Sequence, residues 1–84
     1  MGVEFTQGVV GYLKIGDDHG FVRIDEETGG VETLILWFFD KSEGPVGMYV
    51  MLLSLAISQG LRVELRHEDD SAYVNQVKVL RAAT

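Results

Sequence analysis

Residues 45–60 read PVGMYVMLLSLAISQG, and the fold predicted from the sequence depends most on this segment. It contains no charged residue, it begins with a proline and it ends with a glycine. Proline near the start and glycine just past the end is the asymmetry expected of an α-helix. We therefore expect a helix over residues 45–59, ended by Gly60. On both sides of this helix the chain changes to the alternating pattern of β-strands.

Three strands are predicted before the helix. Residues 6–15 alternate between two faces, residues 16–20 form a tight connection, and residues 21–24 form a short second strand. The acidic and glycine-rich residues 25–30 suit an exposed hairpin loop. Residues 32–39 are apolar on both faces, which predicts a strand covered on both sides and therefore central in the sheet.

Two further strands are predicted after the helix. Residues 61–65 alternate, residues 67–71 turn the chain, and residues 73–79 alternate again. Three strands, one helix and two strands is the element order of an OB-fold, a mainly β, five-stranded Greek-key barrel. A closed barrel also removes the sheet edges that a small β domain must otherwise protect. The alternative is an open antiparallel sheet with the helix packed on one face.

Length and charge limit the classes of function. A chain of 84 residues has room for a single domain over residues 1–84. Seven basic against thirteen acidic residues give a net charge of -6, which opposes binding to phosphate backbones, so a nucleic-acid partner is disfavoured. There is no cysteine, and no apolar run approaches the length of a membrane span. Residues 1–7 lack the pattern of a signal peptide, so we expect a cytoplasmic protein that makes no membrane contact.

One protein family resembles much of this chain. Residues 48–65 and 74–79 look like the helix, glycine, strand, turn and strand of pentameric bacterial toxin B-subunits of the pertussis and subtilase type. Residues 8–11 and 21–24 are similar to the opening strands of that family. The resemblance implies an OB-fold and ring-like assembly. Those B-subunits are secreted, disulfide-bonded and glycan-binding, whereas this chain has no cysteine and matches no glycan-contact residue, so sugar binding is not carried over.

A weaker likeness is to cold-shock domains. It depends on residues 19–24 and 36–38, which read HGFVRI and LWF. The basic and aromatic ribonucleoprotein motifs of that family are only partly present.

The predicted helix has no charge on any side, which is unusual for a surface helix. At about 100° per residue, one broad face is expected to cover the core: Met48, Tyr49, Leu52, Leu53, Leu55 and Ala56. The opposite face is the predicted interface with a second copy or another protein: Val50, Met51, Ser54, Ile57 and Ser58, with Gly47 beside them. The alternative is that this small, mildly polar face lies in water.

The first three strands supply a second candidate surface. If Val9, Leu13, Val22 and Ile24 point inward, alternation sends an aromatic and basic set outward: Tyr12, Lys14, Phe21 and Arg23, joined by Trp37. Rings interleaved with cations are how OB-folds hold single-stranded nucleic acid. The neighbouring loops, with Asp17, Asp18 and the acidic residues 68–70, would repel phosphates. The alternative is that the rings fill the barrel or pack under a neighbouring subunit.

The sequence offers no catalytic motif. It has no cysteine nucleophile, no Gly-x-Ser-x-Gly elbow and no glycine-rich phosphate loop, so we expect no enzyme. His19 and His67 lie at turns without the companions of a zinc site, and His67 is expected at an exposed strand end. The acidic runs 25–27 and 68–70 lack the spacing of a calcium loop. We therefore predict no metal and no cofactor.

Overall fold

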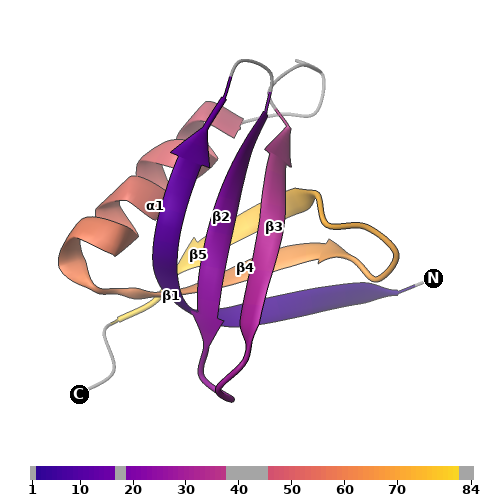
Figure 1. The fold of residues 1–84 in the computed structure, drawn as a ribbon, viewed down its shortest axis with the longest axis horizontal. Helices are drawn as coiled ribbons and strands as arrows, with labels where there is room; N and C mark the ends of the chain where they lie inside the picture. Colours follow the sequence, from indigo (N-terminus) through magenta and orange to yellow (C-terminus); the bar gives the residue numbers. More distant parts are fainter. Residues whose placement is uncertain (1, 17–18, 38–45, 82–84) are drawn as a thin grey trace.

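The computed structural model describes residues 2–16, 19–37 and 46–81, and the side chains of Trp37 and Val46 lie outside that description. The fold is mainly β with one helix, as predicted (Figure 1). Its elements are β1 (Val3–Ile15), β2 (His19–Glu26), β3 (Val31–Trp37), α1 (Val46–Gln59), β4 (Arg62–Glu68) and β5 (Val74–Val79). The predicted helix start at Pro45, the predicted strand end at residues 38–39 and the loop residues Asp17 and Asp18 lie outside the described residues.

The five strands form one antiparallel sheet in the order β3-β2-β1-β4-β5. The sheet is not closed by a regular ladder between its two end strands. β3 meets the residues just before β5 at a parallel bridge between Ile35 and Tyr73, where the Ile35 N–H donates to the carbonyl oxygen of Ala72 at 2.8 Å. The described residues therefore form an open sheet that touches at one point, rather than the closed barrel that the sequence predicts.

Strand β3 is not central, which corrects the expectation from its apolar sequence. Its hydrogen-bonded neighbour in the sheet is β2, and it lies at one end of the strand order. Leu34 and Leu36 are buried in the core, and Ile35 on the other face is half-buried beside Tyr73. The apolar residues on both faces of β3 therefore reflect the contact of Ile35 with Tyr73 and not a central position in the sheet.

The central strand is β1, and two irregularities let it serve both halves of the sheet. Its residues 3–9 pair with β4 and its residues 8–15 pair with β2. Gly8 belongs to both ladders, and an added Cβ there would overlap the carbonyl oxygen of Asp25, so no larger residue fits without backbone movement. The register also shifts between Val10 and Tyr12.

This bulge corrects the predicted inward set. Because one residue is inserted into the ladder, Val10 and Leu13 share the inner face, three positions apart, and Val9 becomes exposed. Val22 and Ile24 are fully buried, as predicted. A period-two pattern continued through Gly11 therefore gives the right face beyond the bulge and the wrong face before it.

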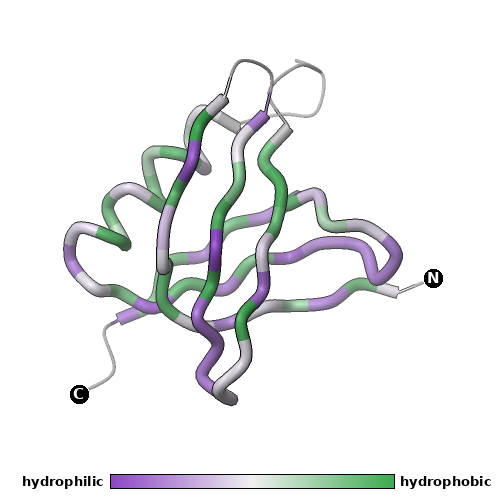
Figure 2. Tube along the Cα trace, in the orientation of Figure 1, coloured by the Kyte–Doolittle hydropathy of each residue, from purple (hydrophilic) through white to green (hydrophobic). Residues whose placement is uncertain are grey.

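Helix α1 packs against β1, β5 and β4 (Figure 1). Leu53 and Ala56 are fully buried in the core, and Tyr49 and Val50 pack against it. The Tyr49 hydroxyl also donates to the carbonyl oxygen of Asn75 at 2.9 Å, which ties the helix to β5. Figure 2 shows hydrophobic residues along α1 and β3, and hydrophilic residues at the turn between β4 and β5.

The helix ends as predicted, at a glycine cap. Gly60 has a φ of 67°, in the left-handed region, and the Leu61 N–H donates to the carbonyl oxygen of Ala56 at 3.0 Å. This is the 6→1 hydrogen bond of a Schellman motif, which satisfies a carbonyl that the helix end leaves without a partner.

Candidate functional site: the exposed face of the helix and the outer face of the sheet

The first candidate surface is the exposed face of α1. Met51 is 69% exposed, Met48 is 59% exposed and Leu55 is 43% exposed. Four smaller or polar residues share this exposure: Gly47, Ser54, Ser58 and Gln59. We call these seven residues the helix face. Large apolar residues lie on it side by side because positions three, four and seven apart share one side of a helix.

The helix face differs from the interface that the sequence predicts. Met48 and Leu55 were expected in the core and are exposed, whereas Val50 was expected in the interface and packs against the core. Met51, Ser54, Ile57 and Ser58 are exposed, as that interface requires. The face is rotated relative to the prediction because Leu53 and Ala56, and not Met48 and Leu55, lie against the sheet.

The helix face carries no charged side chain. α1 has no acidic residue in its first turn and no basic residue in its last turn, and residues 46–59 contain no Asp, Glu, Lys or Arg. The chain as a whole has twenty such residues, seven basic and thirteen acidic. Covering this face therefore removes apolar surface from water without the desolvation of a charge.

The second candidate surface is the outer face of β1, β2 and β3. The register brings two cross-strand pairs together there, Tyr12 opposite Arg23 and Lys14 opposite Phe21. Tyr12 is 42% exposed, Lys14 is exposed, and Phe21 and Arg23 are half-buried. Four of the five predicted residues therefore lie together, while the side chain of Trp37 lies outside the description.

Three further residues belong to this surface and were missed from the sequence. Phe21 lies opposite Ile35, and Ile35 lies opposite Tyr73 of the parallel bridge. Lys14, Phe21, Ile35 and Tyr73 thus form one row across β1, β2, β3 and the residue that precedes β5, which we call the strand row. His19 packs against it, with its ring edge-on to Phe21 at a centroid distance of 5.1 Å. Tyr73 could not be assigned from the sequence because its place depends on a contact between the two ends of the sheet.

The charges on this surface are mixed. Nε of Arg23 lies 3.0 Å from Oδ1 of Asp25, so this cation is partly neutralised. At the end of the strand row near Tyr73, the turn after β4 carries the exposed acidic residues 68–70. Asp69 Oδ2 accepts a hydrogen bond from the Gly2 N–H at 2.9 Å, which holds this turn against the start of β1. The surface therefore suits a ligand with apolar or planar groups better than a polyanion.

His67 is buried, which corrects its predicted place at an exposed strand end. His67 is 6% exposed, and its Nδ1 lies 2.7 Å from the Ser71 carbonyl oxygen and 2.9 Å from that of Glu68. Carbonyl oxygens only accept, so Nδ1 carries a hydrogen, and Nε2 is hydrogen-bonded to the Thr6 hydroxyl at 3.4 Å. His67 therefore has a structural role, joining the β4–β5 turn to β1.

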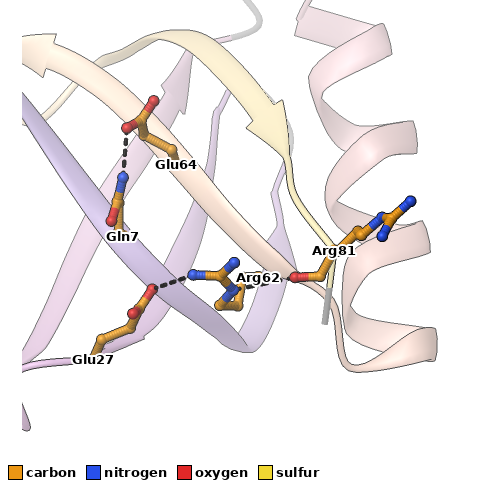
Figure 3. A network of polar contacts seen from close by, with 5 residues as sticks. All are labelled: Gln7, Glu27, Arg62, Glu64 and Arg81. Atoms are coloured by element: carbon orange, nitrogen blue, oxygen red, sulfur yellow. Dashed lines mark hydrogen bonds and ion pairs between the residues drawn. The ribbon is translucent and has the colours of Figure 1, made fainter. Parts of the chain in front are cut away.

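A polar network lies where β1 meets β4 (Figure 3). Gln7 Nε2 donates to Glu64 at 2.6 Å, and Arg62 donates to Glu27 at 3.3 Å and to the Arg81 carbonyl oxygen at 3.1 Å. The Arg62 and Glu27 side chains are 32% and 46% exposed, so this ion pair contributes at most about 1 kcal/mol. The network covers the seam between the strands. A shallow depression beside it is lined by Phe5, Gln7, Glu26, Glu27 and Thr28.

Among residues 2–16, 19–37 and 46–81, no group of three His, Cys, Asp or Glu side chains is arranged to hold a metal ion. In the same described part of the chain, no helix is long and apolar enough to cross a membrane. Comparisons with protein-family models, with curated proteins and with solved structures find no match.

Proposed function

We propose that this protein is a small non-enzymatic assembly module that associates with copies of itself through the helix face. The observation that carries the proposal is the exposure of Met48, Met51 and Leu55 on a helix without any charge. A helix that stays in water normally has charged residues opposite its buried stripe. In α1 the charged residues of that pattern are missing, which supports the proposal that another surface covers the helix face when the protein functions.

An interface of ordinary size would cover a modest part of this small chain. A stable contact between proteins buries about 800 Å² on each partner, which is about one-seventh of the 5316 Å² accessible surface of this chain. Burying a Met or Leu side chain contributes about 1.5 to 3 kcal/mol, and the three large residues together offset part of the entropic cost of association. We expect self-association with a dissociation constant in the micromolar range, which corresponds to a net binding free energy of about -8 kcal/mol.

The test is a single charge placed on the face. Met51→Glu should dissociate the oligomer, because a carboxylate without a partner would be buried at the contact. Light scattering coupled to size-exclusion chromatography at tens of micromolar measures the mass. Because Met51 is 69% exposed within one chain, the variant should fold, which circular dichroism checks.

The matched control is Gln76→Glu, which adds the same charge at an exposed position of β5, outside the helix face. It should leave the mass of the oligomer unchanged. A wild-type protein that is monomeric at these concentrations would contradict the proposal, and so would an oligomer that both variants dissociate equally.

We further propose that the open sheet is an OB-fold with minimal closure. The strand order, the helix between β3 and β4, and a parallel contact between β3 and β5 support this assignment. It agrees with the resemblance to the toxin B-subunits, which assemble as rings. The assignment carries no ligand, because OB-folds host many unrelated functions.

A second candidate function is the binding of single-stranded nucleic acid or oligosaccharide on the outer face of the sheet. The observation that favours it is the strand row, in which the aromatic side chains of Phe21 and Tyr73 lie in line with Lys14 across the outer face of the sheet. Stacking on such rings contributes about 1 to 3 kcal/mol for each base. The net charge of -6 favours the uncharged ligand of the two.

This candidate is tested with two labelled probes, oligothymidylate and a neutral glucan, by fluorescence anisotropy at low salt. Tyr73→Ala, which removes a 48% exposed ring of the strand row, should weaken binding by about 5- to 100-fold if one stacking contact is lost. Phe5→Ala is the control, because Phe5 is a 53% exposed aromatic residue on the other half of β1. Equal effects of the two variants, or no binding of either probe, would remove this candidate.

A further inference from the structure

We infer that two copies pack their α1 helices parallel to each other about a two-fold axis, with Met51 facing Met51 of the second copy. This inference rests on the proposed self-association and adds the geometry of the contact. It follows from the distribution of large and small residues across the helix face, which is not symmetric.

Met51 lies near the middle of the helix face. At about 100° per residue, Met48 and Leu55 lie about 40 to 60° to one side of it and form a ridge. Gly47, Ser54 and Ser58 lie about 20 to 60° to the other side and form a strip of small residues, which we call the groove. One flank of the face is therefore large and apolar, and the other is small.

The two possible two-fold arrangements use these flanks differently. An axis parallel to the helices exchanges left and right, so the ridge of each copy meets the groove of the other. An axis perpendicular to the helices keeps left and right, so ridge meets ridge and groove meets groove. The second arrangement leaves a gap along the groove, whereas the first fills it on both sides, and close packing favours filled contacts.

The partner is assigned as a second copy because the helix face is complementary to itself. The net charge of -6 opposes self-association in general, and a contact through α1 adds no charge repulsion at the interface because the helix has no charged residue. A two-fold contact also needs one self-complementary surface, which the paired ridge and groove supply. Parallel helix dipoles oppose this arrangement by less than about 1 kcal/mol at exposed helix ends.

The test uses the absence of cysteine from the chain, because each introduced thiol is then the only one. Facing helices 8 to 10 Å apart bring opposed Cα atoms within about 4 to 6 Å, as a disulfide requires. Two Met51→Cys chains should cross-link under mild oxidation at a rate at least about tenfold above that of two Gln76→Cys chains. The reason is that the two thiols held together in the dimer have an effective concentration of about 1 mM.

The direction of the helices is read from mixed pairs, with one chain carrying a mass tag. A parallel contact predicts a disulfide between Leu55→Cys and Ser54→Cys, which join ridge to groove at one height. An antiparallel contact predicts one between Met48→Cys and Leu55→Cys, which a parallel dimer holds about 10 Å apart along the helix. The Leu55→Cys and Ser54→Cys pair leaves Met51 unchanged, so it still detects the dimer if Met51→Cys weakens association.

The outcomes separate the inference from the proposed function. Cross-linking of Leu55→Cys with Ser54→Cys, but not of Met48→Cys with Leu55→Cys, supports the parallel dimer. The reverse result overturns the parallel geometry and retains the helix face as the contact. Equal yields from both pairs also overturn it, because no single register exists. Wild-type oligomers in which no position on α1 cross-links faster than Gln76→Cys overturn both the inference and the proposed function.

Discussion

Gly8 is the residue on which the two halves of the sheet depend most directly. It pairs with Glu26 of β2 on one side and with Val63 of β4 on the other, so backbone approaches it from both directions. An added Cβ would overlap the carbonyl oxygen of Asp25 and lie 2.8 Å from its carbonyl carbon. Backbone atoms of a strand cannot move aside as a side chain can.

Gly8→Ala should therefore lower the free energy of unfolding by roughly 3 kcal/mol, at the upper end of overpacking effects. Gly11→Ala is the control in the same strand, because its Cβ would meet the flexible Asp25 carboxylate at 3.0 Å. We expect it to cost less than about 1 kcal/mol. Urea denaturation measures both values, and equal losses would show that the close approach at Gly8 is unimportant.

At this scale the sequence predicts inward and outward residues only while the strand stays regular. Val22 and Ile24 follow the alternation, but Val9 does not, because the bulge at Gly11 moves it to the other face. His67 was misplaced because its partners Thr6 and Ser71 belong to other segments. A polar residue in an alternating strand gives no sign of such a buried hydrogen-bond site.

Among the elements, α1 is the one that the sequence predicts best, since a glycine and a composition without charge define it locally. Its orientation was predicted less well. A helix apolar on all sides gives no contrast from which to choose the buried face. The choice is made by the packing of Leu53 and Ala56 against the sheet, which exposes Met48 and Leu55.

Gly60→Ala tests the local signal at the end of this helix. A φ of 67° costs an L-residue about 1 to 2 kcal/mol, so the variant should be less stable by that amount while keeping its fold. Nothing lies within 4 Å of an added Cβ at Gly60, so steric overlap does not contribute. Thermal unfolding of Gly60→Asn should show a smaller loss, because Asn tolerates this conformation; an equal loss would contradict the cap assignment.

For the whole molecule, the sequence predicts the element types and misses how the ends of the sheet meet. The contact of Ile35 with Tyr73 joins residues from opposite ends of the strand order, and no local pattern encodes it. The strand row is completed by that contact, so its members Ile35 and Tyr73 could not be assigned to one surface from the sequence. The helix face was predicted in part, because the lack of charge is a property of one segment.

The double pairing of β1 also constrains the order in which this chain can become structured. Val3 pairs with Glu68, so the first strand obtains its second neighbour only after residues 62–68 have been made. Until then the hairpin of β1 and β2 presents an open edge to solvent and to other nascent chains. Contacts this distant slow the search for the native topology, and domains rich in them fold in about milliseconds to seconds. β1, which pairs with both halves of the sheet, is thus separated from its second partner, β4, by most of the folded domain's sequence.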